Sequence, residues 1–156
     1  MDPRDRWFED HLEGEMHEFG DRPVTAEEIV AFARDFDPQP FHLSDEGGKA
    51  SPFGGLIASG WHTAAIAMRL WCDHALSRHG IGSPGLDELK WPAPVRPGDR
   101  LHARATVLAT RRSRSRPSMG LVRTRVELFN QRSELVCSWT AIGFVRCRSA
   151  ERPKDD

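Results

Sequence analysis

The segment Asp37-Pro-Gln-Pro-Phe-His42 holds an aspartate and a histidine whose separation is restricted by two intervening prolines. Each proline ring keeps its φ angle at about −65°, so the chain between Asp37 and His42 has few accessible conformations. A carboxylate and an imidazole at a constant separation can bind one water molecule together and move its protons. The alternative is a turn that ends a helix and leaves a surface histidine, because proline-flanked aspartates are common in turns. This segment is the first candidate for acid–base chemistry.

Two further segments accompany it, PFGGLIASGWHTA at residues 52–64 and VRPGDRL at residues 95–101. The Asp37 segment resembles the D-x-N-P-x-H signature of the MaoC-like, R-specific enoyl-CoA hydratases. Residues 52–64 resemble the F-x-x-x-I-x-x-G segment that opens the central helix in that family, and residues 95–101 resemble its entry to a strand of the sheet. The resemblance covers roughly residues 20–147. It implies an α+β class, a single hotdog domain in which an antiparallel sheet wraps around a long central helix.

The resemblance also implies a reaction and three catalytic residues. The protein would be a hydro-lyase that adds water to, or removes it from, the 2,3-bond of an acyl-CoA thioester. Asp37 and His42 would activate water and deliver a proton, and the pattern leaves open which is the acid and which the base. The N–H of Gly60, at a helix start, would stabilise the thioester oxygen as it gains charge. No metal and no cofactor is expected, apart from coenzyme A as part of the substrate.

Two departures from the family pattern keep other functions open. Gln39 stands where the family has asparagine, and Ser59 where a histidine often precedes the helix glycine. Both changes favour a catalytically idle acyl-CoA-binding module, whereas the intact Asp37 and His42 argue against it. The second alternative is a hotdog thioesterase, which usually relies on a carboxylate on or near the central helix. Residues 60–72 contain no Asp or Glu, which argues against that activity.

Candidate substrate contacts fall in two separate segments of the chain. Phe53 and Trp61 are predicted to line an acyl tunnel, with Ser59 beside them, although large aromatic residues are more often part of a core. Arg114 and Arg116, in the run RRSRSRP, are predicted to bind the phosphates of coenzyme A, because guanidinium groups suit phosphate oxygens. A solvated hairpin tip is the alternative for this run. The remaining histidines and the cysteines show no metal-like spacing.

The elements that must position these residues can be read from local signals. A strand is predicted over residues 15–22. Thr25, with Glu28 three residues on, predicts a helix start of the capping-box type. The apolar face of that helix is predicted to hold Ile29, Val30, Phe32, Ala33 and Phe36. Pro38 requires this helix to end by Asp37, because the residue before a proline avoids helical angles.

The second half of the chain changes from helical to strand periodicity. Residues 44–55 are rich in Gly and Ser and predict a loop. Residues 60–77 are apolar on most sides and predict a buried helix, capped by Ser59 or Gly60. Four long antiparallel strands are then predicted as a meander, over residues 85–95, 101–112, 120–130 and 135–148, with turns at residues 97–100 and 130–133 and an arginine-rich loop at 113–120.

Length and composition agree with one globular domain. The chain has 156 residues, with 38% hydrophobic and 29% charged residues, which is ordinary for a soluble protein. We predict an N-terminal arm over residues 1–13, held loosely, a hotdog domain over residues 14–148 and a polar tail over residues 149–156. No apolar run approaches the roughly 18–20 residues that span a bilayer, and residues 1–15 do not resemble a signal peptide. Three scattered cysteines suit a reducing compartment, so a cytoplasmic location is expected.

Charge is unevenly distributed along the chain. Residues 1–46 contain 14 acidic residues and 4 arginines, whereas residues 96–125 contain 9 arginines and a single acidic residue. The pattern indicates a partner site, an anionic ligand, halves that pair with each other, or strands that simply face water. Nucleic acid is the least favoured partner, since the net charge is −1 and no aromatic residues interleave the arginines. The family resemblance implies a homodimer, and pairing across the exposed edge of a small sheet favours one.

Overall fold

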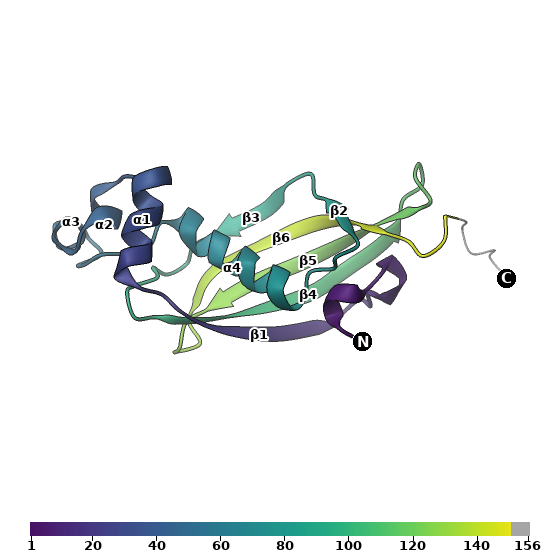
Figure 1. The fold of residues 1–156 in the computed structure, drawn as a ribbon, viewed down its shortest axis with the longest axis horizontal. Coiled ribbons are helices and arrows are strands. Elements are labelled where there is room, and N and C mark those ends of the chain that lie inside the picture. Colours follow the sequence, from purple (N-terminus) through teal and green to yellow (C-terminus); the bar gives the residue numbers. More distant parts are fainter. Residues whose placement is uncertain (151–156) are drawn as a thin grey trace.

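The computed structural model of the chain describes residues 1–150, so most of the predicted tail at 149–156 lies outside the described residues. One six-stranded antiparallel sheet has the order β1-β4-β5-β6-β2, and the short β3 pairs with β6. The long helix α4 lies against one face of this sheet, and α1, α2 and α3 gather at one end of it (Figure 1). The strands are β1 (Met16–Pro23), β2 (Gly80–Gly82), β3 (Leu86–Lys90), β4 (Arg100–Arg112), β5 (Met119–Phe129) and β6 (Leu135–Arg146).

The helices are α1 (Ala26–Phe36), α2 (Pro40–Leu43), α3 (Asp45–Lys49) and α4 (Gly60–His74), with short 3-10 helices η1 (Pro3–Asp5) and η2 (Phe8–Asp10) before β1. An antiparallel sheet packed around one long helix confirms the predicted fold class. The core lies between α4 and the sheet because alternate residues of the long strands face the helix. On β4 and β5 these are Leu101, Ala103, Ala105, Val126 and Leu128, as the alternation predicted.

The predicted meander of four long strands is wrong in one element. Only β4, β5 and β6 form it. The strand predicted over residues 85–95 is reduced to Leu86–Lys90 and pairs with β6, on the other side of the sheet from β4 and β1. Pro92 and Pro94 have no backbone N–H to offer a neighbouring strand, so the chain leaves the sheet after Lys90. Residues 91–99 then cross past the start of α4 before β4 begins.

Helix α4 differs from its prediction in length and in burial. It ends at His74, because Ala75 leaves helical angles, although its N–H still makes the last helical bond, to the carbonyl of Trp71. One face is buried against the sheet, with Ile66, Ala67 and Leu70 in the core. The opposite face is open in the single chain, where Trp61 is 58% exposed. The prediction that this helix is buried around most of its circumference is therefore wrong for the single chain.

The polar segment before α4 contains more helix than predicted. The capping box of Thr25 and Glu28 starts α1, and Asp37 caps its C-terminal end, as predicted. Phe36 is 72% exposed, so it does not join the apolar face of this helix.

The loop predicted over residues 44–55 contains α3, which Ser44 caps by accepting a bond from the Gly47 N–H. Two adjacent glycines concealed this helix, because glycine is a poor helix former. A side chain at Gly48 would overlap the Gly55 carbonyl, so this crossing requires glycine.

The N-terminal arm is not held loosely. The Arg6 guanidinium is buried and donates to Glu15 at 2.6 Å and to the Ala75 carbonyl at 3.3 Å. The Trp7 ring stacks on His79 with 3.7 Å between ring centroids. These contacts attach residues 1–13 to the segment that follows α4.

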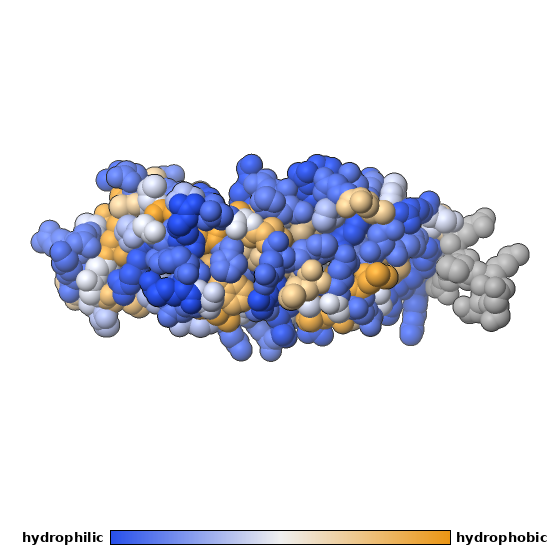
Figure 2. Space-filling view, turned by 90° about the horizontal axis from the view of Figure 1, so that it is seen from below, coloured by the Kyte–Doolittle hydropathy of each residue, from blue (hydrophilic) through white to orange (hydrophobic). Residues whose placement is uncertain are grey.

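The acidic and basic segments pair with each other across the fold, one of the four interpretations of the charge pattern. Seen from the side on which β1 lies, the surface is mainly hydrophilic and is interrupted by apolar patches (Figure 2). Exposed ion pairs contribute little stability each. Three pairs join the two segments, Asp21–Arg100 at 2.8 Å, Glu18–Arg104 at 2.6 Å and Glu9–Arg112 at 2.8 Å. A fourth, Asp10–Arg148 at 2.5 Å, uses an arginine outside residues 96–125.

Candidate active site

Asp37 and His42 meet where α1 ends and α2 begins. Asp37 is the C-cap of α1, and Pro40 is the first residue of α2, a position that suits its fixed φ angle and missing N–H. His42 lies within this short helix and is buried. Its Nε2 atom is 3.3 Å from Oδ2 of Asp37. The two prolines therefore link consecutive helices, and they bring the predicted pair of side chains together.

The orientation of His42 is set by the backbone of the segment before α4. Its Nδ1 atom lies 2.7 Å from the carbonyl oxygen of Ile57. A carbonyl oxygen can only accept a hydrogen bond, so Nδ1 must carry a proton. The ring edge packs against Phe41, with 4.5 Å between centroids. Nε2 is therefore the nitrogen that faces Asp37: it accepts from water when the imidazole is neutral and donates when the imidazole is charged.

Both carboxylate oxygens of Asp37 accept hydrogen bonds from side chains. Ser59 Oγ donates to Oδ2 at 2.7 Å, and Gln39 Nε2 donates to Oδ1 at 2.7 Å. Partial burial acts to raise the pKa of Asp37, but these hydrogen bonds and the nearby His42 outweigh it and hold the pKa below the usual 3.8. Asp37 is thus an ionised acceptor at neutral pH. Gln39, noted from the sequence only as a departure, has a direct contact in this site.

Ser59 connects this pair to the start of α4. It is fully buried, at 0% exposure, and its hydroxyl also accepts a bond from the Trp61 N–H at 3.2 Å as the cap of α4. The predicted contact of Ser59 with substrate does not fit this position, because the hydroxyl is already held between Asp37 and the helix. A capping serine lies where the first turn of a helix begins, so one residue both starts α4 and orients Asp37.

Gly60 is the first residue of α4, and its N–H has no acceptor among residues 1–150. The first N–H groups of a helix have no partner within the helix, and they lie at its positive end. A Cβ atom on this residue would be 2.5 Å from the indole ring of Trp91, so only glycine fits beneath that ring. Gly60, His42 and Trp91 line one pocket of about 290 Å³. An oxygen gaining negative charge can be bound there.

The two predicted aromatic contacts occupy different places. Phe53 lines the pocket that holds His42 and packs on Phe41 at 5.4 Å between centroids. Trp61 meets Trp91 edge to face at 5.3 Å and lines a second, larger cavity instead. The two indoles lie at the junction between these cavities.

Arg114 and Arg116 lie far from the pair in this chain. They belong to the hairpin between β4 and β5, at the opposite end of the sheet from α1, α2 and α3 (Figure 1). Strand β4 starts near the pocket and spans about 40 Å before it reaches this hairpin. The structure therefore does not bring the arginines to the Asp37–His42 site of the same chain.

Two contributors to the site had no signal in the sequence. Ile57 holds His42 through a backbone carbonyl, for which any residue type would serve. Trp91 covers Gly60 from the segment after β3, and nothing in the local pattern distinguishes it from a core tryptophan.

Among residues 1–150, no group of three or more His, Cys, Asp or Glu residues is arranged to hold a metal ion. Within the same residues, every helix is too short or too polar to cross a bilayer.

A family model, solved structures and known proteins that are similar to this chain agree with one another. The MaoC like domain family matches residues 9–128. A solved MaoC-like dehydratase from Rhodospirillum rubrum is 47% identical, with a TM-score of 0.87, over 92% of this chain and 99% of that chain. The 3-hydroxyacyl-thioester dehydratase Z of Mycobacterium tuberculosis is 32% identical over 110 residues, 67% of this chain and 72% of that protein. A conserved hypothetical protein of M. tuberculosis with a double hotdog fold is 16% identical with a TM-score of 0.77, covering 97% of this chain and 48% of that one. The fold is the hotdog fold.

Proposed function

Because this chain belongs to the MaoC-like domain family, whose relatives include dehydratases, we propose that it hydrates or dehydrates the 2,3-bond of an acyl-CoA thioester. One observation carries the proposal: His42 Nε2 lies 3.3 Å from Asp37 Oδ2 in a site that borders the Gly60 amide. This arrangement supplies two proton acceptors and one donor for a developing oxyanion, which are the groups that addition of water to an enoyl thioester requires.

The proposed mechanism uses the two acceptors on one water molecule. The water donates one hydrogen to Nε2 of neutral His42 and the other to Oδ2 of Asp37. Its oxygen attacks carbon 3, its proton passes to Nε2, and the electrons of the double bond move onto the thioester oxygen. The Gly60 N–H stabilises that oxygen. His42, now charged and paired with Asp37, returns the proton to carbon 2, and dehydration follows the same steps in reverse.

A homodimer is part of the same proposal. Large apolar side chains are exposed on α4 (Trp61 and Met68), on β2 (Ile81), on β3 (Leu86) and directly after β3 (Trp91). Adjacent exposed apolar residues on a monomer are typical of an interaction surface. The relative with a double hotdog fold supports the pairing of two such units. Contact of Arg114 and Arg116 with coenzyme A phosphates requires the partner subunit, because the distance within one subunit is too great. A cytoplasmic location and the lack of a further cofactor remain predictions.

The test is an assay of enoyl-CoA thioesters from crotonyl-CoA to longer and branched chains. Loss of enoyl absorbance without release of thiol is expected, whereas thiol release would indicate a thioesterase. His42→Ala is expected to reduce the rate by about 10²–10⁴-fold. The matched control is His102→Ala, because His102 stacks on Phe129 away from the pocket. Equal rates for the parent and His42→Ala would contradict the site assignment.

A further inference from the structure

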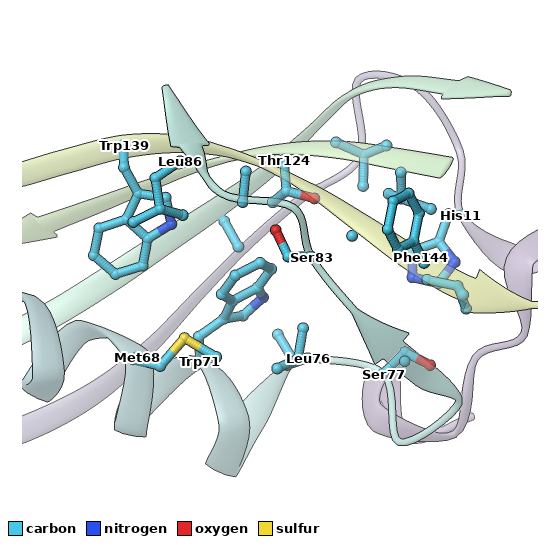
Figure 3. A pocket seen from close by; sticks show the side chains of 18 of the residues that line it. His11, Met68, Trp71, Leu76, Ser77, Ser83, Leu86, Thr124, Trp139 and Phe144 are labelled. Atoms are coloured by element: carbon cyan, nitrogen blue, oxygen red, sulfur yellow. The ribbon is translucent and has the colours of Figure 1, made fainter. Parts of the chain in front are cut away.

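Two buried side-chain nitrogen atoms have no hydrogen-bond partner among residues 1–150, Nε1 of Trp139 and Nδ1 of His62. Trp139 lines the larger cavity, of about 540 Å³, which lies between α4 and the sheet (Figure 3). An indole does not change its charge near neutral pH, whereas an imidazole gains a proton in mild acid. His62 is therefore the one of the two whose fit in the fold depends on pH.

His62 lies in the first turn of α4, two residues after Gly60, where α1 packs against that helix (Figure 1). It is 6% exposed and lines neither of the two cavities. The ring of Phe32, from α1, stacks on the imidazole with 4.9 Å between centroids and an interplanar angle of 14°. The imidazole is thus covered by a neighbouring helix and is not part of the candidate active site.

The neutral form of this ring fits its surroundings. Nε2 is not buried, so water can accept the proton that it carries, and Nδ1 then holds a lone pair. A charged imidazolium has a proton on both nitrogens, and Nδ1 has no acceptor for it among the described residues. Burial therefore disfavours the charged form and lowers the pKa of His62 below the usual 6.5.

The neighbouring charges offer no counter-ion to a protonated ring. Glu28 of α1 and Arg22 of β1 are the charged groups that act on His62, and they act in opposite directions. Both oxygens of Glu28 already accept hydrogen bonds, Oε1 from Arg22 at 3.1 Å and the Thr25 N–H at 3.2 Å, and Oε2 from Arg22 at 2.9 Å. The imidazolium can therefore be hydrated only if the helix that covers it moves away.

Helix α1 also carries Asp37 at its end. The Asp37 N–H donates to the Ala33 carbonyl at 2.9 Å, and Oδ2 accepts from Ser59 at 2.7 Å. Helix α1 is thus joined to the start of α4 at two places, through Phe32 on His62 and through Asp37 on Ser59. The two places are five residues apart on α1, a rise of about 7 Å. A movement of α1 away from His62 therefore also draws Asp37 away from Ser59.

We propose that His62 is a positioning residue, which holds α1 against α4 while its ring is neutral and releases α1 when its ring is protonated, so that mild acid separates Asp37 from Ser59. The release of α1 does not depend on the proposed function. Its consequence for catalysis, the loss of the Asp37–His42 pair, rests on that function.

The first measurement follows hydrogen exchange of the α1 backbone amides in the parent protein from about pH 7 to about pH 4.5. Because the folded state has the lower pKa, the contribution of His62 is fully present above about pH 6.5 and is lost as the pH falls through the folded value. After correction for intrinsic exchange, the opening equilibrium of α1 is expected to rise by up to about tenfold per pH unit. Asp37 does not titrate in this range, since its pKa lies below 3.8.

Two variants assign the effect to one ring. His62→Phe keeps an aromatic ring against Phe32 and removes the titration, so the protection of α1 should no longer depend on pH in this range. His74→Phe is the matched control, because His74 lies on the same helix and stacks on Phe19 at 5.6 Å between centroids, yet is exposed. This control should open α1 with the same pH dependence as the parent.

A second measurement does not require a variant to fold. In the parent protein with ¹³C-labelled histidine, the ring signals of His62 are expected to titrate below pH 6.5. The backbone amide signals of Asp37 and Ser59 should shift with the same midpoint.

The inference is overturned if His62 titrates at or above pH 6.5, if the exchange of α1 does not depend on pH, or if the dependence persists in His62→Phe. Release of α1 in a protein that hydrates no enoyl-CoA would support this inference and refute the proposed function. Hydration by a protein whose α1 stays closed in mild acid would refute this inference alone.

Discussion

At the scale of single residues, the site depends on how Asp37 is held. Ser59 and Gln39 donate to its two oxygens, which orients Oδ2 towards His42 and keeps the carboxylate ionised. Neither residue matches the family pattern, yet together they satisfy a partly buried charge that would otherwise be unfavourable. In this chain the departures from the pattern therefore support the acid–base pair.

Ser59→Ala is expected to lower kcat by about tenfold or more with little change in KM, because the variant loses a hydrogen bond to the proposed catalytic carboxylate of Asp37. The pKa of Asp37 should rise, since burial remains and one stabilising bond is gone, so the acid limb of the pH–rate profile should move to higher pH. Ser44→Ala is the matched control: it removes the cap of α3 without touching Asp37. An unchanged pH profile for Ser59→Ala would contradict this role.

Cys137 offers a separate test of burial. It is fully buried in the core, and burial raises the pKa of its thiol to about 12 from the usual 9.0. A hydrogen bond with the Trp91 side chain lowers this pKa, but by less than burial raises it. Between these values the folded state keeps a proton that the unfolded state has lost. Stability should therefore fall as pH rises above about 9, by at most about 1.4 kcal/mol per pH unit from this group.

Denaturant unfolding at pH 8 to 11 measures this slope, and the absence of tyrosine removes one competing titration. Cys137→Ala should reduce the slope, whereas Cys72→Ala, at an exposed position, should retain most of it. Equal slopes in the parent and Cys137→Ala would show that the thiol does not carry the effect.

At the scale of elements, the site is formed by three helix ends. Helix α1 ends at Asp37, α2 begins at Pro40 just before His42, and α4 begins at Gly60 under the Trp91 ring. Helix ends expose unpaired backbone groups, so the same geometry that stops and starts helices supplies the polar groups of the pocket.

Gly60→Ala is expected to lower kcat/KM by about 10²-fold or more, because the added methyl group would lie 2.5 Å from the Trp91 ring and must displace it or the helix start. The double variant Gly60→Ala with Trp91→Ala should be more active than Gly60→Ala alone, since the second change removes the overlap. Steady-state kinetics on the four members of this cycle provide the check. Strictly additive losses would show that the contact between the two positions is not the cause.

At the scale of the whole molecule, the single chain leaves its central helix incompletely covered. The sheet covers one face of α4, and the other face joins the apolar side chains around β3. A single small sheet also keeps an unpaired edge at β3, which a second copy can satisfy by the same surface on both subunits. The ion pairs between β1 and β4 lie along the β1 edge and leave that edge polar.

Leu86→Glu is expected to convert the proposed dimer to monomer, because Leu86 is 48% exposed in one subunit and a charge there would be buried in the interface. Sedimentation velocity at several concentrations gives the measurement. Leu12→Glu is the matched control, since Leu12 is also exposed but lies on the N-terminal segment and lines neither cavity. A parent protein that sediments as a monomer at all concentrations would exclude the interface.

The sequence by itself determined the parts that depend on neighbouring residues. Thr25 and Glu28 start a helix, Pro38 stops it, two prolines bring Asp37 and His42 together, and alternation along residues 101–112 and 120–130 marks two strands. Each of these follows from steric restriction or hydrogen bonding within a few residues, so the local pattern was sufficient.

Only the tertiary structure decided which distant residues meet. Ser59 reaches Asp37 across 22 positions, Trp91 covers Gly60, and β3 pairs with β6 and not with β4. The same topology separates Arg114 and Arg116 from the pocket and leaves the Trp139 N–H buried without an acceptor among residues 1–150. These contacts depend on strand order and on the path of residues 91–99, which no short-range periodicity specifies, because a strand's pattern shows which face is buried but not which strand lies beside it.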